Sequence, residues 1–390
     1  MIQALFAGLP FLVCLFWLIL FAIEYRDANP AKRFLTYFLL VCTFLYFAHA
    51  VYFNRDVELY SIIESIYAFC SLAVYPLFYL YIQKLTNSKP LTWKNYWVLL
   101  PALITTLWAM LFYAMMGEGE RIHFTTHYFF NQEVPDHVAS FVENGQLIRI
   151  RVMKILFLIQ LFPVSYFGFK KLKNFSNEVS NFYADTENKT LTPIRRLLLL
   201  FILFALFSAS ANQLGREFFL QKSWLVVVPS FVFSIMLFTV SYFGFKQHFT
   251  ANDYNKEQQK ANNEENKLAG VHSIALLKKQ LQQLMEEEEL FRRKDLHISD
   301  IALMTGSNRT YISNYINKEL HLSFSDFINQ YRIHYAQSLM TESNNRLSML
   351  QISELSGFAN EVSFYRNFKK VSGTTPHNWL KGKMPIDNHA

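Results

Sequence analysis

The side chains best suited to chemistry lie in the last quarter of the 390-residue chain, in a run from Ile298 to Asn317. Polar side chains that are short or forked recur in this run. Such side chains can hydrogen-bond the base edges and phosphates of DNA. The residues of this run that we predict to contact DNA are Ser307, Asn308, Arg309, Thr310, Ser313, Asn314 and Asn317.

These residues need two helices joined by a tight turn to position them. Ala302 is small enough for two helices to cross closely, and Gly306 tolerates the positive φ that the turn requires. Ser307 is predicted to cap the second helix. The apolar side chains expected on the inner faces are Ile301, Ile312 and Ile316.

A second unit of the same kind runs from Ile352 to Pro376, after a long helix predicted at about Ser325–Thr341. Ser353 and Gly357 take the positions of Ala302 and Gly306, with one extra residue in the turn. The residues of this unit that we predict to contact DNA are Asn360, Glu361, Ser363, Tyr365, Arg366, Lys369 and Lys370.

The second unit resembles the C-terminal domain of AraC/XylS-type transcription regulators. The residues that carry the resemblance are Gly357-Phe358, Phe364, Arg366, Phe368-Lys369-Lys370, Gly373 and Thr375-Pro376, and it covers about residues 275–382. It implies a seven-helix domain whose two recognition helices read successive major-groove segments of double-stranded promoter DNA. Two departures, Ser353 in place of the usual Ala and Val362-Ser363 in place of Ser-Tyr, leave the base contacts of this unit open.

The N-terminal two thirds of the chain are apolar. A bilayer about 30 Å thick needs roughly 20 apolar residues of helix. Seven such runs are present, and the sequence therefore predicts an all-α protein, a seven-span membrane bundle followed by the double helix-turn-helix domain. The runs are Leu5–Ile23, Phe34–Phe53, Tyr60–Ile82, Trp97–Met116, Leu147–Phe169, Leu197–Leu214 and Trp224–Phe245.

The connections between the spans predict the orientation of the bundle. Those after the first, third and fifth spans hold twelve Lys and Arg, whereas the alternate ones hold four: Arg55, Arg121, Arg216 and Lys222. Positively charged loops stay in the cytoplasm. We therefore expect a bacterial inner-membrane protein with its N-terminus outside and its C-terminal domain in the cytoplasm.

Polar residues within the spans suggest a ligand pocket. Ionisable residues at membrane depth are candidates for function, and His49 and Glu64 are expected at similar depth on either side of a very short turn. Asn212 and Gln213 lie near the same end of the sixth span. The four could line a pocket for an unknown small-molecule or protein signal, or they could only join helices by hydrogen bonds.

Metal, disulfide and cofactor chemistry are not indicated. His123 and His127 have i, i+4 spacing, but neither a Cys nor a clear acidic partner reinforces them or His137, so we expect no metal site. Cys14, Cys42 and Cys70 lie in apolar runs and are expected to pack as small apolar side chains. No cofactor and no enzyme activity are expected.

The predicted domains are a membrane sensor at 1–246, a flexible polar linker at 247–272, a DNA-binding domain at 273–382 and a disordered tail at 383–390. The favoured function is a membrane-bound regulator that couples a signal to promoter binding. Formation of a homodimer in the membrane is one way in which the signal could change DNA binding. The alternatives left open are a transporter with a regulatory tail, a lipid-modifying enzyme, and a plain membrane anchor for DNA.

Overall fold

The computed structural model describes residues 2–130, 140–187, 189–214, 218–219, 224–265, 274–342 and 347–383. Over these residues the chain is helical, and its β structure amounts to one isolated bridge. The predicted all-α fold is confirmed. The chain divides into two compact units: residues 1–173 with 192–251, and residues 174–191 with 252–390.

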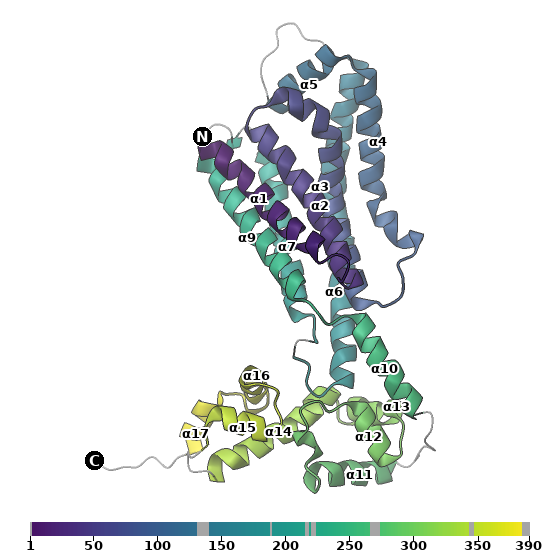
Figure 1. Cartoon of the computed structure of the whole chain (residues 1–390), viewed down its shortest axis with the longest axis vertical. Helices are drawn as coiled ribbons and strands as arrows, with labels where there is room; N and C mark the ends of the chain where they lie inside the picture. The colour runs from purple at the N-terminus through teal and green to yellow at the C-terminus, as the bar shows by residue number, and fades with distance from the viewer. Residues whose placement is uncertain are drawn as a thin grey trace, which may run out of the picture. The chain divides into compact units, whose positions relative to one another are not determined.

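The first unit is a bundle of long helices that run side by side (Figure 1). A short helix, α5, lies at one end of the bundle, and a 3₁₀ turn at Trp93–Leu99 precedes α4. The helices are α1 (Ile2–Ile23), α2 (Pro30–Phe53), α3 (Val57–Thr86), α4 (Leu100–Met115), α5 (Glu118–Phe130), α6 (Phe141–Phe182), α7 (Thr192–Leu214) and α9 (Trp224–Lys246).

Local sequence explains where these helices begin. Asn29 caps α2 by accepting a hydrogen bond of 2.9 Å from the backbone N–H of Lys32, and Pro30 occupies the first helical position, where its missing N–H costs nothing. Asp56 caps α3 by accepting a bond of 3.0 Å from the N–H of Leu59. Only residues 54–56 separate the end of α2 from the start of α3, so this turn is tight, as the sequence predicts.

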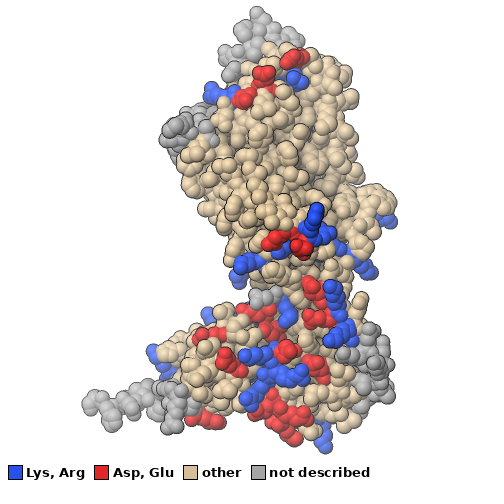
Figure 2. All heavy atoms as spheres, in the orientation of Figure 1, with Lys and Arg blue, Asp and Glu red and all other residues tan. Residues whose placement is uncertain are grey.

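The flank of this bundle is apolar. Large apolar side chains on α1, α4 and α6 point outward, and Phe162 of α6 is 75% exposed. Figure 2 shows almost only uncharged side chains between the two ends of the unit, with Lys, Arg, Asp and Glu near the ends. Exposed apolar surface of this extent is unusual for a protein surrounded by water.

Six helical segments among the described residues are long and apolar enough to cross a membrane, one fewer than the sequence analysis expects. They lie in α1, α2, α3, α7 and α9, and in the stretch from Trp93 to Met115. The remaining expected span, Leu147–Phe169, is helical but lies within the 42 residues of α6. Arg149, Arg151 and Lys154 make this stretch of α6 more polar than the other expected spans.

The second unit contains the end of α6, the segment 183–191 and α10 (Ala251–Glu265), followed by a C-terminal domain. Within residues 274–342 and 347–383 this domain has seven α-helices, as the family resemblance implies. They are α11 (Ile274–Glu286), α12 (Ile298–Thr305), α13 (Arg309–Asn314), α14 (Phe324–Glu342), α15 (Met349–Leu355), α16 (Glu361–Ser372) and α17 (Pro376–Lys383).

Residues 251–265, which lie within the linker predicted at 247–272, form the helix α10. The reason is a thin apolar stripe, Ala251, Tyr254 and Ala261, whose side chains are buried although their neighbours are polar. The Tyr254 ring centroid lies 5.6 Å from that of Phe182 at the end of α6. Residues 266–273, with the end of the predicted linker, and the predicted tail after Lys383 lie outside the described residues.

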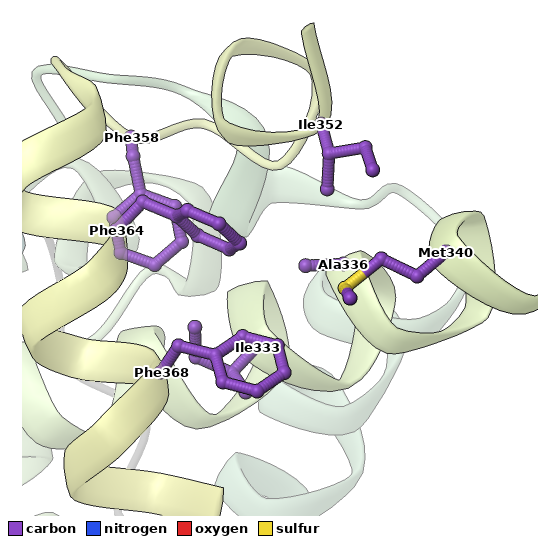
Figure 3. Close-up of a cluster of buried hydrophobic side chains, with 7 residues drawn as sticks. All are labelled: Ile333, Ala336, Met340, Ile352, Phe358, Phe364 and Phe368. Atoms are coloured by element: carbon purple, nitrogen blue, oxygen red, sulfur yellow. The ribbon is translucent and has the colours of Figure 1, made fainter. Parts of the chain in front are cut away.

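One apolar core holds the second half of the domain together (Figure 3). Ile333 and Ala336 of α14 face Phe364 and Phe368 of α16, and Trp379 of α17 packs against the Phe368 ring at 6.0 Å between centroids. Burial of a large aromatic side chain contributes about 2–3 kcal/mol. This core fixes α16 on the long helix α14.

Candidate functional site

The first helix-turn-helix motif is formed by α12 and α13. Gly306 ends α12 with a φ of +61°, in the left-handed region that the sequence analysis requires of it. Asn308 caps α13, because its Oδ1 accepts a hydrogen bond of 2.7 Å from the N–H of Tyr311. The prediction that Ser307 is the cap is therefore wrong by one residue, and Ser307 is only 2% exposed.

The inner faces of this motif are apolar, as expected, since Ile301, Ile312 and Ile316 are all buried. After α13 the chain continues in one π-helical turn, Tyr315–Glu319. Among the predicted DNA contacts of this motif, Asn308, Thr310 and Asn314 are exposed. Ser313 and Asn317 are half-buried and hydrogen-bond each other, with Nδ2 of Asn317 donating to the Ser313 hydroxyl at 2.9 Å.

The second motif is formed by α15 and α16. Asn360 caps α16 by accepting a bond of 2.9 Å from the N–H of Ser363, and Ser363 itself is buried. Arg366 and Lys369 are exposed, whereas Lys370 forms an ion pair with Asp326 of α14. The remaining predicted contacts, Glu361 and Tyr365, are half-buried.

A buried arginine that the sequence analysis missed joins the two motifs. Nε of Arg332 donates to the carbonyl of Phe291 at 2.7 Å, and Nη2 donates to that of Arg293 at 2.6 Å. Its guanidinium also lies 5.6 Å from the ring centroid of Phe358. Burial lowers the pKa of Arg332 to about 10, and the nearby carboxylate of Asp185 acts in the opposite direction. Arg332 therefore stays charged at neutral pH and ties α14 to the segment before α12.

Arg309, a predicted DNA contact, is occupied within the second unit. Its Nη2 donates a hydrogen bond of 2.7 Å to Oδ1 of Asn262 in α10, and its Cζ lies 5.5 Å from the ring centroid of Phe182. Arg309 begins the recognition helix α13, whereas α10 and Phe182 belong to segments that leave the helical bundle. Local sequence does not indicate these partners, because Asn262 falls in the predicted linker and Phe182 in the predicted membrane domain.

The chain after α6 is docked on the same motif. The N–H of Ala184 donates to the carbonyl of Leu296 at 2.9 Å, and the carbonyl of Ala184 accepts from the hydroxyl of Ser325 at 2.8 Å. Tyr183 and His297 form the isolated antiparallel bridge. Phe182, Tyr183 and Ala184 are all buried. Backbone and side-chain bonds together thus hold residues 182–184 against the start of α12 and of α14.

The bundle contains a buried ion pair. Nη2 of Arg149 donates to both carboxylate oxygens of Glu64, at 2.8 and 3.0 Å. Arg149 is 0% and Glu64 1% exposed. Gln146 completes the network: its Oε1 accepts from Nε of Arg149 at 2.5 Å and its Nε2 donates to the carbonyl of Ala109 at 3.0 Å. Glu64 therefore joins α3 to α6 and, through Gln146, to α4.

A cavity of about 190 Å³ lies between α1, α2, α3, α6, α7 and α9. His49 lines it, whereas Glu64 does not and is held instead by Arg149. Asn212 and Gln213 lie in α7, and their side chains are outside the described residues. The structure thus keeps one of the four predicted pocket residues at a cavity and assigns Glu64 to a different network.

The histidines of the expected outer loop give no metal cluster in the described part of the chain. His123 and His127 lie on α5, and Nδ1 of His123 is 3.9 Å from the Glu143 carboxylate. Within the described residues no group of three His, Cys, Asp or Glu side chains could hold a metal ion. His137 lies outside the described residues, and Cys14, Cys42 and Cys70 are buried thiols.

Comparison with known proteins bears on the C-terminal segment. Residues 289–382 match the family model described as Helix-turn-helix domain. This segment is an AraC-type helix-turn-helix domain. The matched segment begins after α11 and ends within α17, so both motifs lie inside it.

The similar proteins are named as regulators. The chain is 34% identical over 92 residues to the uncharacterized HTH-type transcriptional regulator YtdP of Bacillus subtilis, over 24% of this chain and 12% of that protein. It is 26% identical over 103 residues to an uncharacterized HTH-type transcriptional regulator of Staphylococcus aureus, over 26% of this chain and 13% of that protein. The chain thus matches about an eighth of the length of these relatives. No solved structure matches the chain.

Proposed function

We propose that this chain is a membrane-anchored transcription regulator of the AraC type, whose bundle sits in the bacterial inner membrane and controls DNA binding by its cytoplasmic domain. The helix-turn-helix domain and its relatives, which are named transcriptional regulators, support the DNA-binding half of this proposal. The apolar flank of the bundle and its six apolar segments support the membrane half. Excess Lys and Arg in alternate connections supports the orientation.

Helix α6 is the proposed seventh crossing. Its 42 residues rise about 63 Å at 1.5 Å per residue, twice the thickness of the hydrocarbon. The charge of Arg149 is neutralised by Glu64, which lowers the cost of its position in the bundle. Ile155, Ile159 and Phe162, on one face of α6, are exposed apolar side chains suited to lipid.

The observation that carries the coupling is the contact of Arg309 with Asn262 and Phe182. Both partners lie in segments that continue directly from bundle helices, Phe182 from α6 and Asn262 from the chain after α9. A signal can act only through its different affinity for two states of the protein. We infer that one state keeps Arg309 on α10 and the end of α6, and that the other releases it to DNA.

A transporter with a regulatory tail is less well supported. Unwound helix pairs, which would favour it, are not seen at Pro76 or Pro163, where α3 and α6 continue as helices. The described residues of α9 likewise continue through Pro229.

Chromatin immunoprecipitation of the full chain with a C-terminal tag tests the proposal. We expect discrete promoter peaks that disappear in the double variant Arg366→Ala, Lys369→Ala, since both side chains are exposed on α16. The double variant should still fractionate with the membrane, which controls for loss of the protein. Uniform recovery along the chromosome, or a tag that protease reaches from outside intact cells, would refute the proposal.

A further inference from the structure

The cavity of the bundle carries a further inference, which concerns the chemistry of its occupant. Most of its lining is aromatic or aliphatic, contributed by six helices, as with Tyr46, Phe201 and Leu237. Its volume of about 190 Å³ is close to that of cavities of roughly 150 Å³ that accept a molecule the size of one aromatic ring. The space therefore suits a small apolar body.

One lining residue is out of keeping with an apolar space. Lys154 of α6 reaches the cavity and is half-buried. It makes no ion pair or hydrogen bond with any residue that the structure describes. The described lining contains no Asp or Glu, and its only other ionisable group of basic character is His49. Among the residues that the structure describes, the cavity thus offers a cation without a counter-ion.

Arg149, five residues earlier on the same helix, shows how this bundle treats a cation that is buried. Glu64 and Gln146 accept three hydrogen bonds from its Nε and Nη2, and the Glu64 carboxylate supplies the counter-charge. A cation at membrane depth is costly unless it is paired or reaches water. Lys154 has no such carboxylate partner among the described residues. Because its side chain lines the cavity, a bound anion in the cavity could supply the missing counter-charge.

We propose that this cavity binds a small amphiphile with a single carboxylate, which pairs with Lys154 while its apolar part fills the space among the aromatic side chains. A carboxylate and an ammonium form a charge-assisted hydrogen bond that is stronger in a medium of low dielectric constant. The cavity volume favours a single short chain or ring over a phospholipid with two acyl chains. That the amphiphile acts as the signal rests on the proposed function, whereas its binding does not.

Equilibrium dialysis of radiolabelled octanoate against the full chain in phosphatidylcholine nanodiscs tests this site, with empty nanodiscs as the background for partitioning. We expect saturable binding at one site. Lys154→Gln should weaken it by about tenfold or more, the effect of losing one charged hydrogen bond, while Lys154→Arg should keep it within about threefold. Arg151→Gln is the matched control, because Arg151 is exposed on the same helix and outside the lining.

Three further measurements test whether the carboxylate charge is needed, whether the cavity is the binding site, and whether an anionic lipid binds there instead. Octanamide, which has no charge, should not compete with octanoate. Ala209→Phe, which fills the cavity from α7, should abolish binding, and this variant tests the site independently if Lys154→Gln fails to fold. Replacing the lipid by phosphatidylglycerol should leave the octanoate affinity unchanged. Absence of saturable binding, equal competition by octanamide, undiminished binding to Lys154→Gln, or displacement by phosphatidylglycerol would each overturn the proposal. Promoter occupancy is not measured in this assay, so failure of the regulator proposal would leave its result standing.

Discussion

Nη2 of Arg309, at the first turn of the recognition helix, donates a hydrogen bond of 2.7 Å to Oδ1 of Asn262 in α10. The same guanidinium lies over the ring of Phe182, with 5.5 Å between Cζ and the ring centroid. The Nη2 bond to Asn262 takes up one of the donors that a bidentate pair with a phosphate or a guanine would use. Under the proposed function, in which Arg309 contacts DNA, DNA and α10 would therefore compete for this side chain.

Removal of the α10 partner should shift this competition toward DNA. Asn262→Ala deletes the acceptor of the Arg309 bond, and a partly exposed charged bond contributes about 1 kcal/mol. We expect the full chain to bind DNA up to about fivefold more tightly. Gel mobility shifts on a promoter fragment recovered by immunoprecipitation would measure the change.

Gln259→Ala is the control for this experiment, because Gln259 is exposed on the same helix. It should leave the affinity unchanged. Arg309→Ala should lower the affinity for every sequence or relax specificity at one position, according to whether Arg309 reaches a phosphate or a base. If Asn262→Ala binds DNA no better than the Gln259 variant, the competition between α10 and DNA does not exist.

The Glu64–Arg149 pair gives a prediction about the bundle. Glu64→Gln leaves a fully buried arginine without its counter-charge, which costs about 3–5 kcal/mol in known cases. We expect the unfolding temperature of the full chain in detergent to fall by roughly 10 °C. Glu58→Gln, an exposed change on the same helix, should lower it by much less.

A second variant separates loss of the pair from general damage to α3. In Glu64→Gln combined with Arg149→Met no uncompensated charge remains, so stability should recover in large part. A double variant as unstable as Glu64→Gln alone would contradict the assignment of the loss to the unpaired guanidinium.

Local sequence was sufficient to predict the helix-turn-helix motifs and the positions of their glycines. Gly306 and Gly357 both adopt positive φ, and Ala302 and Ser353, which take matching places in the two motifs, are both buried. These features depend on residues within a few positions of one another. The cap of α13 was misplaced by one residue, since Ser307 and Asn308 are both good capping residues and only the backbone geometry selects Asn308.

Contacts between distant parts of the chain could not be predicted in this way. Arg309 and Asn262 are 47 residues apart, and Arg149 and Glu64 are 85 apart. Two opposite charges in apolar spans could have suggested the second pair, since neither is stable alone at that depth. Nothing in the polar sequence of 251–265 signalled α10, because its stripe of three apolar residues is too thin to stand out from a linker.

The serine that departs from the family pattern offers a test by stabilisation. Ser353 is fully buried, and its hydroxyl meets no hydrogen-bond partner among the described residues. An unsatisfied buried hydroxyl costs about 1–3 kcal/mol, so Ser353→Ala should stabilise α15. Hydrogen exchange of the α15 amides in the full chain would measure this as slower exchange.

The same substitution at the start of this helix should have the opposite effect. Ser348 caps α15, accepting a bond of 3.2 Å from the N–H of Gln351, and Ser348→Ala should speed the exchange of the same amides, as expected for a loss of about 1 kcal/mol. Faster exchange in Ser353→Ala would mean that its hydroxyl has a partner, such as a bound water, that stabilises the fold.

The two turn glycines should respond differently to a side chain. Gly306 has open space around the position of a Cβ, so Gly306→Ala should cost only the roughly 1–2 kcal/mol of left-handed backbone. At Gly357, with a φ of +84°, a Cβ would lie 2.6 Å from the carbonyl oxygen of Arg292. Gly357→Ala must therefore also displace the backbone before α12, and we expect faster hydrogen exchange throughout α15 and α16.

Asparagine separates the two causes, because it tolerates the left-handed conformation better than alanine but still carries a Cβ. Gly306→Asn should recover much of the protection lost in Gly306→Ala. Gly357→Asn should recover little, since its Cβ meets the same Arg292 backbone. Equal recovery at both positions would mean that backbone conformation alone requires glycine at 357, and that the close approach of residue 292 imposes no separate constraint.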